Sequence, residues 1–160
     1  MVPGLLLSDL VLKWKEQLAA SAAVGEFCLK KFGKKPHIFV GVDPANPPAS
    51  TDCPYIIIRP VLKKEGNKRK QYRYTAAVSW SVVNSVKTIT NEITELAGLY
   101  DCDKLGQIIL NALAQASPAN PISYVKYRLP AGESNTFPQF EGSMEIKVYV
   151  TTSMGGKLSY

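Results

Sequence analysis

The N-terminal part of the chain carries hydrophobic residues at every third or fourth position, which places them on one face of a helix. These apolar positions are Leu7, Val11, Trp14, Leu18 and Ala22. Ser8 or Asp9 is expected to cap the helix start, because a short side-chain oxygen accepts a hydrogen bond from an unpaired backbone amide. The helix either ends at Gly25 or continues to Phe32 and stops at Gly33.

A two-residue period follows the helical segment and predicts strands. His37 to Val42 is a short strand candidate, and a proline-rich loop comes after it. Tyr55 to Leu62 is an apolar, β-branched run, and Pro60 within it indicates a sheet edge or a bulge. Beyond a polar turn, apolar and polar residues alternate from Tyr72 to Val82, as expected for a strand with one buried face. These two runs predict a long antiparallel hairpin.

A second helix is expected over residues 88–116, with a break near Gly98. Its apolar positions are Ile89, Ile93, Leu96, Tyr100, Leu105, Ile108, Ile109, Ala112, Leu113 and Ala116. Asp101 or Asp103 is expected to cap a restart of the helix after the break. Pro118 prevents the helix from continuing.

The last part of the chain predicts a second hairpin. Residues 122–129 form one strand, and the regular alternation of residues 141–150 forms the other. The predicted fold class is α+β: an antiparallel sheet of four to five strands built from two hairpins, with two main helices packed on one face. We expect one domain over residues 1–153 and a flexible C-terminal tail over residues 154–160, which contains Gly155 and Gly156.

The composition is that of a globular domain with an excess of positive charge. The chain has 160 residues, of which 46% are hydrophobic and 20% charged, so it can fold without a disulfide or a metal. A formal net charge of +6 favours contact with polyanions. The odd count and wide spacing of Cys28, Cys53 and Cys102 indicate reduced thiols in a cytosolic protein.

No segment has the pattern of a signal peptide or a membrane span. The apolar run at Leu5, Leu6 and Leu7 is interrupted by Ser8 and Asp9, and it is too short for a signal-peptide core. No stretch approaches the roughly eighteen apolar residues of a membrane helix. The protein is therefore expected in the cytoplasm, with no membrane partner.

Residues that would carry catalysis are sparse. His37 is the single histidine, and a lone histidine beside Pro36 favours a packing or surface role. Asp101 and Asp103 are better explained by helix capping than by a catalytic pair. No spacing indicates a metal site or a phosphate loop. We expect no enzymatic activity, no metal and no cofactor.

A basic turn over residues 63–70 is the best candidate for a binding site. The candidate residues for an interface or a polyanion contact are Lys63, Lys64, Lys68, Arg69, Lys70, Tyr72 and Tyr74. Basic and aromatic side chains in succession are suited to bind phosphates and to stack on bases. The interpretation we favour is a solvated hairpin tip, whose charges prevent aggregation between sheet edges.

The order of elements resembles that of phage tail terminator and tail completion proteins, a class of minor tail proteins. An N-terminal amphipathic helix leads through His37–Gly41 to a proline-rich loop at Asp43-Pro44. The long hairpin from Tyr55 to Val82 has an extended polar turn, and Phe137–Gly142 leads into an alternating last strand. The resemblance covers most of residues 5–152.

The resemblance implies a structural role in the tail of a bacteriophage or prophage. Proteins of this class form a ring, commonly a hexamer, that caps the tail tube and joins it to the head. The implied partners are further copies of the chain, the tail tube protein, the head–tail connector proteins and DNA passing through the ring. The implied location is the bacterial cytoplasm and then the virion tail. The alternative is a nucleic-acid-binding module that uses the basic turn 63–70.

Overall fold

A computed structural model describes residues 6–65, 71–116, 120–129 and 137–151. The helices are α1 (Leu7–Ala20), α2 (Ala22–Phe32) and α3 (Ala97–Ala116), and a short 3-10 turn, η1, spans Ser50–Asp52. The strands are β1 (His37–Val40), β2 (Tyr55–Glu65), β3 (Gln71–Val83), β4 (Lys87–Thr90), β5 (Ile93–Leu96), β6 (Ile122–Arg128) and β7 (Gln139–Thr151).

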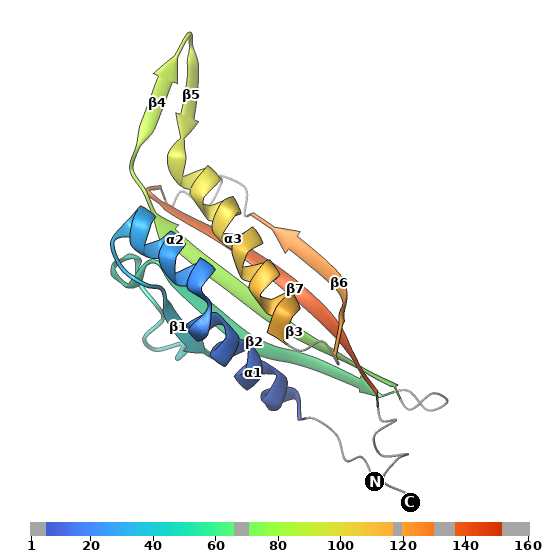
Figure 1. The fold of residues 1–160 in the computed structure, drawn as a ribbon. Coiled ribbons are helices and arrows are strands. Elements are labelled where there is room, and N and C mark those ends of the chain that lie inside the picture. The colour runs from blue at the N-terminus through green and yellow to red at the C-terminus, as the bar shows by residue number, and fades with distance from the viewer. Residues whose placement is uncertain (1–5, 66–70, 117–119, 130–136, 152–160) are drawn as a thin grey trace, which may run out of the picture.

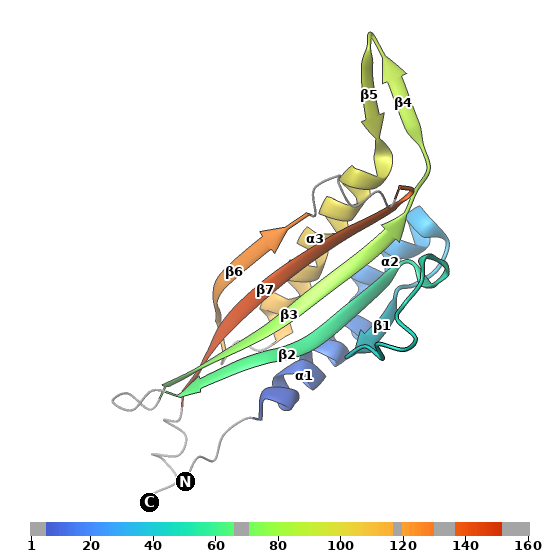
Figure 2. The same cartoon turned by 180° about the vertical axis from the view of Figure 1, so that it is seen from behind.

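Five strands form one sheet in the order β1-β2-β3-β7-β6, and β4 pairs with β5 in a separate two-stranded sheet. The three helices lie against one face of the large sheet, as Figure 1 shows, and Figure 2 shows the opposite face without a helix. The predicted α+β class is confirmed. The sheet is mixed, because β1 pairs in parallel with β2 while its other pairs are antiparallel.

The N-terminal helix is divided in two at Ser21. This residue has an extended backbone, and its hydroxyl accepts a hydrogen bond from the backbone amide of Val24 at 3.3 Å, which starts α2. Gly33 ends α2 in the left-handed conformation, with φ of 79°. At the start of α1, the Asp9 carboxylate accepts a hydrogen bond from the Leu6 backbone amide at 2.9 Å. Asp9 is the third residue of the helix, and it caps the amide of Leu6, the residue just before the helix.

The prediction of a helix from residue 88 is wrong for the first nine residues of that segment. Residues 87–96 form the β4–β5 hairpin, and α3 begins at Ala97. Asn91 and Glu92 both have positive φ, 48° and 67°, as a two-residue hairpin turn with the twist of its strands requires. Threonines and isoleucines dominate the two strands, and these residues prefer extended backbone. Asp101 and Asp103 lie inside α3 and do not cap it.

Both predicted hairpins are present as antiparallel pairs, β2 with β3 and β6 with β7. The register of β2 shifts between Pro60 and Leu62, so the predicted bulge is confirmed. Pro60 also lies at a sheet edge, because β1 pairs with β2 only as far as Ile58 and Pro60 is paired with β3 alone. The predicted tail, 154–160, lies outside the described residues.

The core lies between the helices and the alternate residues of the long strands. Trp80 on β3 is among its largest buried side chains, with only 1% of its surface exposed. The indole passes so close to α3 and β7 that a Cβ atom on Gly106 or on Gly142 would overlap it. Its Nε1 donates a hydrogen bond to the Cys102 carbonyl at 2.8 Å, and the Tyr127 ring lies 5.4 Å away. Two glycines therefore allow helix, strand and indole to pack in direct contact.

Replacement of Gly106 by alanine should destabilise the protein. The added methyl has no room against Trp80, so we expect the free energy of unfolding to fall by about 2 kcal/mol in urea denaturation. Gly25→Ala is the matched control, because its new Cβ would lie 3.7 Å from Lys35, an ordinary contact. That change should stabilise α2 by about 0.5–1 kcal/mol. Equal effects of both substitutions would contradict the close packing described above.

Candidate interaction surfaces

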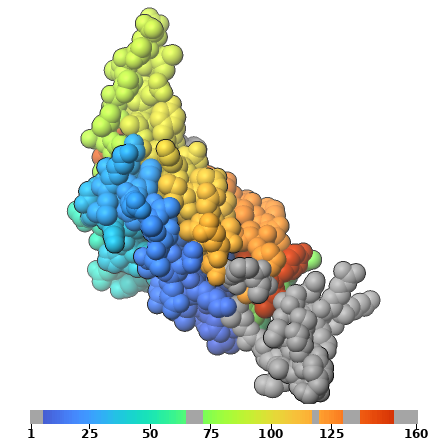
Figure 3. All heavy atoms as spheres, in the orientation of Figure 1, coloured from blue at the N-terminus to red at the C-terminus, as the bar shows by residue number. Residues whose placement is uncertain are grey.

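The β4–β5 hairpin, Lys87–Leu96, projects from one end of the molecule and is called the arm below. Figures 1 and 3 show it standing clear of the helices and the sheet. Its residues are exposed except Leu96, which is half-buried. Ile89 and Ile93 have 71% and 59% of their surface exposed. Ile89 is paired with Thr94 and Ile93 with Thr90, so each face of the arm presents one isoleucine to solvent.

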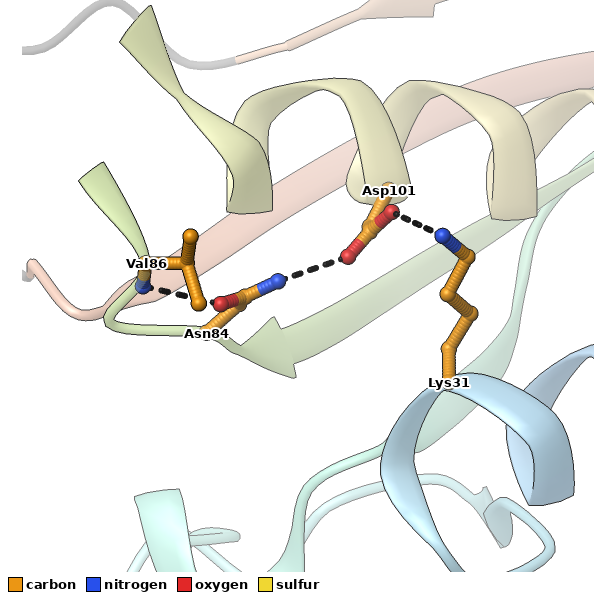
Figure 4. A network of polar contacts seen from close by, with 4 residues as sticks. All are labelled: Lys31, Asn84, Val86 and Asp101. Carbon is orange, nitrogen blue, oxygen red and sulfur yellow. Dashed lines mark hydrogen bonds and ion pairs between the residues drawn. The ribbon is translucent and has the colours of Figure 1, made fainter. Parts of the chain in front are cut away.

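The base of the arm is held by a network of polar contacts, drawn in Figure 4. The Asn84 amide nitrogen donates to Asp101 Oδ2 at 2.8 Å, and Asn84 Oδ1 accepts from the Val86 amide at 2.9 Å. Lys31 of α2 lies 3.5 Å from Asp101 Oδ1. The Ala97 amide donates to the Val86 carbonyl at 3.1 Å, which joins the two ends of the arm. Asp101 is thus a positioning residue, and its local sequence carries no signal for this contact.

The second surface is the sheet face opposite the helices, called the open face below. The register of the four long strands places small residues at its centre, among them Ala77, Ser79 and Ser143. Basic residues surround this centre, namely Arg59, Lys64, Arg73, Lys126, Arg128 and Lys147. Glu141 and Glu145 are the carboxylates on the same face of these strands.

Two of the cations on the open face lie against tyrosine rings. The Arg73 guanidinium is 5.6 Å from the centre of the Tyr149 ring, directly across from it on β7. Lys147 Nζ is 5.0 Å from the ring of Tyr124, its neighbour on β6. Each ring attracts its cation through its negative face, which limits the side-chain positions of the cation. The open face therefore carries two cation–tyrosine pairs, and both include a residue of β7.

Near β1 the open face carries a small apolar cluster. Cys53, Tyr55 and Ile57 are buried there, with Phe39 and Val83 packed around them. His37 stacks on Phe39, with ring centres 4.1 Å apart. The predicted packing or surface role of the single histidine agrees with this stacking.

The residues predicted around the basic turn fall into three groups. Lys68, Arg69 and Lys70 lie outside the described residues. Lys64 is exposed on the open face, and Lys63 Nζ lies 5.7 Å and 5.4 Å from the rings of Tyr72 and Tyr74. Both tyrosines point into the core and are 7% and 0% exposed, so their rings are not presented for stacking on bases. A role for the turn itself stays a prediction.

A hollow of about 450 Å³ lies where α1, α2 and the segment before β1 meet. Its lining is largely apolar, with Leu18, Leu29 and Ile38, and its charged residues are Glu26 and Lys35.

Within the described ranges, no group of three or more histidine, cysteine or acidic residues is placed to hold a metal. Among the helices of these ranges, none has the length and apolar character to cross a membrane.

Comparisons with known proteins give distant similarity to solved structures only. No protein-family model and no curated protein matches the sequence. Among solved structures, the chain is similar to a chain of the "Virion of native gene transfer agent (GTA) particle". That match has a TM-score of 0.47 and 12% identity, and it covers 88% of this chain and 92% of that chain. At this level of similarity the match decides neither fold nor function.

Loss of the Asn84 side chain should loosen the arm. In Asn84→Ala the buried Asp101 carboxylate loses its amide donor and Val86 loses its acceptor, which should cost about 1–3 kcal/mol. Hydrogen exchange should become faster at Val86, Ala97 and the amides of the arm. Gln107→Ala is the control, because it removes an exposed hydrogen bond to Asn111 elsewhere on α3. Unchanged exchange in the arm of Asn84→Ala would show that the network does not hold it.

The three cysteine thiols should be unreactive in the folded protein. Burial raises the pKa of Cys28 and of Cys102 from the ordinary 9.0 to about 12, and it also raises the pKa of Cys53. The reactive thiolate is therefore scarce, and a thiol reagent at pH 8 should react fully only in denaturant. The thiols ionise more easily in the unfolded chain. Their contribution to stability is thus complete below pH 9 and declines as the pH rises toward 12. Urea denaturation at pH 8 and pH 10.5 measures this decline.

Proposed function

We propose that this chain is a non-catalytic structural protein of a phage-like tail, and that its copies assemble into a closed ring. The resemblance in element order to tail terminator and tail completion proteins supports this role. A protein in such a role acts through surfaces that bind its neighbours, and it does not need a catalytic cleft. The partners would be other copies of the chain, the tail tube protein and the head–tail connector proteins. The protein would act in the host cytoplasm and then in the virion tail.

The arm is the observation that carries the proposal. An isolated two-stranded hairpin is at best marginally stable in water. This one exposes an isoleucine on each face and is fixed at its base by Asn84 and Asp101. A fixed, exposed, partly apolar projection loses little entropy when a neighbour covers it. Burial of each isoleucine would contribute roughly 2 kcal/mol to the association.

The edges of the sheet offer a second means of contact between copies. β1 lies at one edge and β6 at the other, and the backbone groups on their outer sides are placed to pair with a further strand. A contact between different surfaces of identical copies closes into a ring when its rotation divides a full turn. Each copy would then give its arm to one neighbour and receive the arm of the other. A hexamer is the ring size that the family resemblance favours.

The alternative, a nucleic-acid-binding module centred on the turn 63–70, takes second place. Its two aromatic residues, Tyr72 and Tyr74, are buried in the core, so stacking on bases would require the sheet to open. The cations of the turn alone would supply only salt-sensitive, sequence-independent attraction.

The test is the mass of the particle in solution, measured by light scattering and viewed by electron microscopy. We expect a ring with an open centre, at high concentration or in the presence of tail tube protein. Ile89→Ser should weaken this assembly at least tenfold and leave the melting temperature unchanged, because Ile89 is 71% exposed and lies outside the core. Leu12→Ser is the control, since Leu12 is a 44% exposed leucine on α1, away from the arm. Monomers under all these conditions would refute the proposal.

A further inference from the structure

We propose that the open face of the five-stranded sheet binds the sugar–phosphate backbone of nucleic acid without reading its bases. The proposal rests on the cations of the described strands and does not include the turn at 66–70. It is independent of ring formation, because a single copy presents the whole face.

The charge of the molecule is concentrated on this face. Six cations and two carboxylates give the four long strands a formal charge of +4 on the open side. The whole chain has a formal charge of +6, so two thirds of the excess lies on one surface. A surface with a net positive charge attracts a polyanion and raises its rate of encounter.

The open face is large enough for its cations to contact several phosphates of one nucleic acid. The face extends about 20 Å along β3 from Arg73 to Ser79. Ser79 marks the far end because it is in register, through Ser143 on β7, with the cation Arg128 on β6. From β2 to β6 the face extends about 14 Å, three strand spacings. Duplex DNA carries one charge per roughly 1.7 Å of its axis, or about twelve charges over the length of about 20 Å along β3. Several phosphates therefore come within reach of the six cations at once.

The centre of the face allows a backbone to approach closely. Ala77, Ser79 and Ser143 have short side chains, so the rim cations extend further from the sheet than these three residues do. Glu145, which is paired with Ala77, is also paired with the cation Lys126 on β6. The contacts with Tyr149 and Tyr124 hold Arg73 and Lys147 in place, which lowers the entropy lost when they bind a phosphate. A guanidinium forms short, charge-assisted hydrogen bonds with phosphate oxygens.

The same geometry argues against base recognition. The major groove admits a helix or a two-stranded ribbon, and this face is five strands wide. The Tyr124 and Tyr149 rings lie beneath cations, so one side of each ring is occupied. Binding through phosphates alone is expected to be independent of sequence.

The first measurement is fluorescence anisotropy of a labelled 30-base-pair duplex, titrated with the full chain at increasing salt. If four phosphates are contacted, log Kd should change with log salt with a slope near 3.6, about a 150-fold loss of affinity between 50 and 200 mM salt. A 30-nucleotide single strand should also bind, with a shallower slope. Absence of binding to both probes at 50 mM salt would overturn the proposal.

The second measurement separates this face from the overall charge. The triple variant Arg59→Glu, Arg73→Glu, Lys126→Glu should lose binding at least a hundredfold. The triple variant Lys13→Glu, Lys30→Glu, Lys104→Glu changes the charge equally at exposed positions on the helices and should lose less than tenfold. Melting curves check that both variants fold, and the single variant Arg73→Gln should lower the salt slope by about 0.9. An equal loss in both triple variants would contradict a site on the open face.

Two further results would overturn the assignment of the ligand. Polyglutamate of the same charge, if it bound as tightly as the duplex, would point to an acidic protein as the partner. A strong preference for single strands that disappears in Tyr124→Leu would show base stacking in place of backbone contact. The expected result is a preference for nucleic acid over polyglutamate and no effect of Tyr124→Leu beyond about threefold.

Discussion

The contact of Trp80 with α3 and β7 determines how the rest of the molecule is arranged. The indole lies against the sheet at Gly142 and against the helix at Gly106, and its nitrogen donates to the Cys102 carbonyl. The hydroxyl of Tyr127 donates to the Asp103 carbonyl and carboxylate at 2.9 Å and 2.8 Å, so the edge strand β6 is joined to the same helix. Because α3 cannot move along or away from the sheet without breaking these contacts, its first residue has a defined position, and the arm departs from there.

The arm and the open face follow from this arrangement in different ways. The arm is a local structure whose direction is set by contacts made elsewhere, from α2 through Lys31 and from α3 through Asp101. The open face exists because all three helices are used on the other side of the sheet. One side of each long strand is buried by the core, so its polar residues gather on the opposite side. Assembly through the arm and contact with nucleic acid through the open face would use separate surfaces and do not compete.

Several elements could be predicted from local patterns. The alternating apolar residues of β3 and β7 and the apolar residues three or four apart in α1 are the ones buried in the structure. A period of two in a strand, or of three to four in a helix, places the apolar residues on one face. The helical spacing of Ile89, Ile93 and Leu96 predicts a helix from residue 88, where the structure has the β4–β5 hairpin. The turn at Asn91 and Glu92 contains no glycine, so the usual signal of a hairpin is absent there.

The sequence by itself determined the fold class and the two hairpins, because each depends on residues that are neighbours in the chain. It left two glycines, Gly25 and Gly33, as possible helix ends, and the structure selected Gly33. Only the tertiary structure decided which sheet edge β1 would join, that Asp101 holds the base of the arm, and that Tyr72 and Tyr74 face the core. It also brought the cations of β2, β3, β6 and β7 onto one surface. Those outcomes depend on strand register and helix position, and both are set by the packing of residues far apart in the chain.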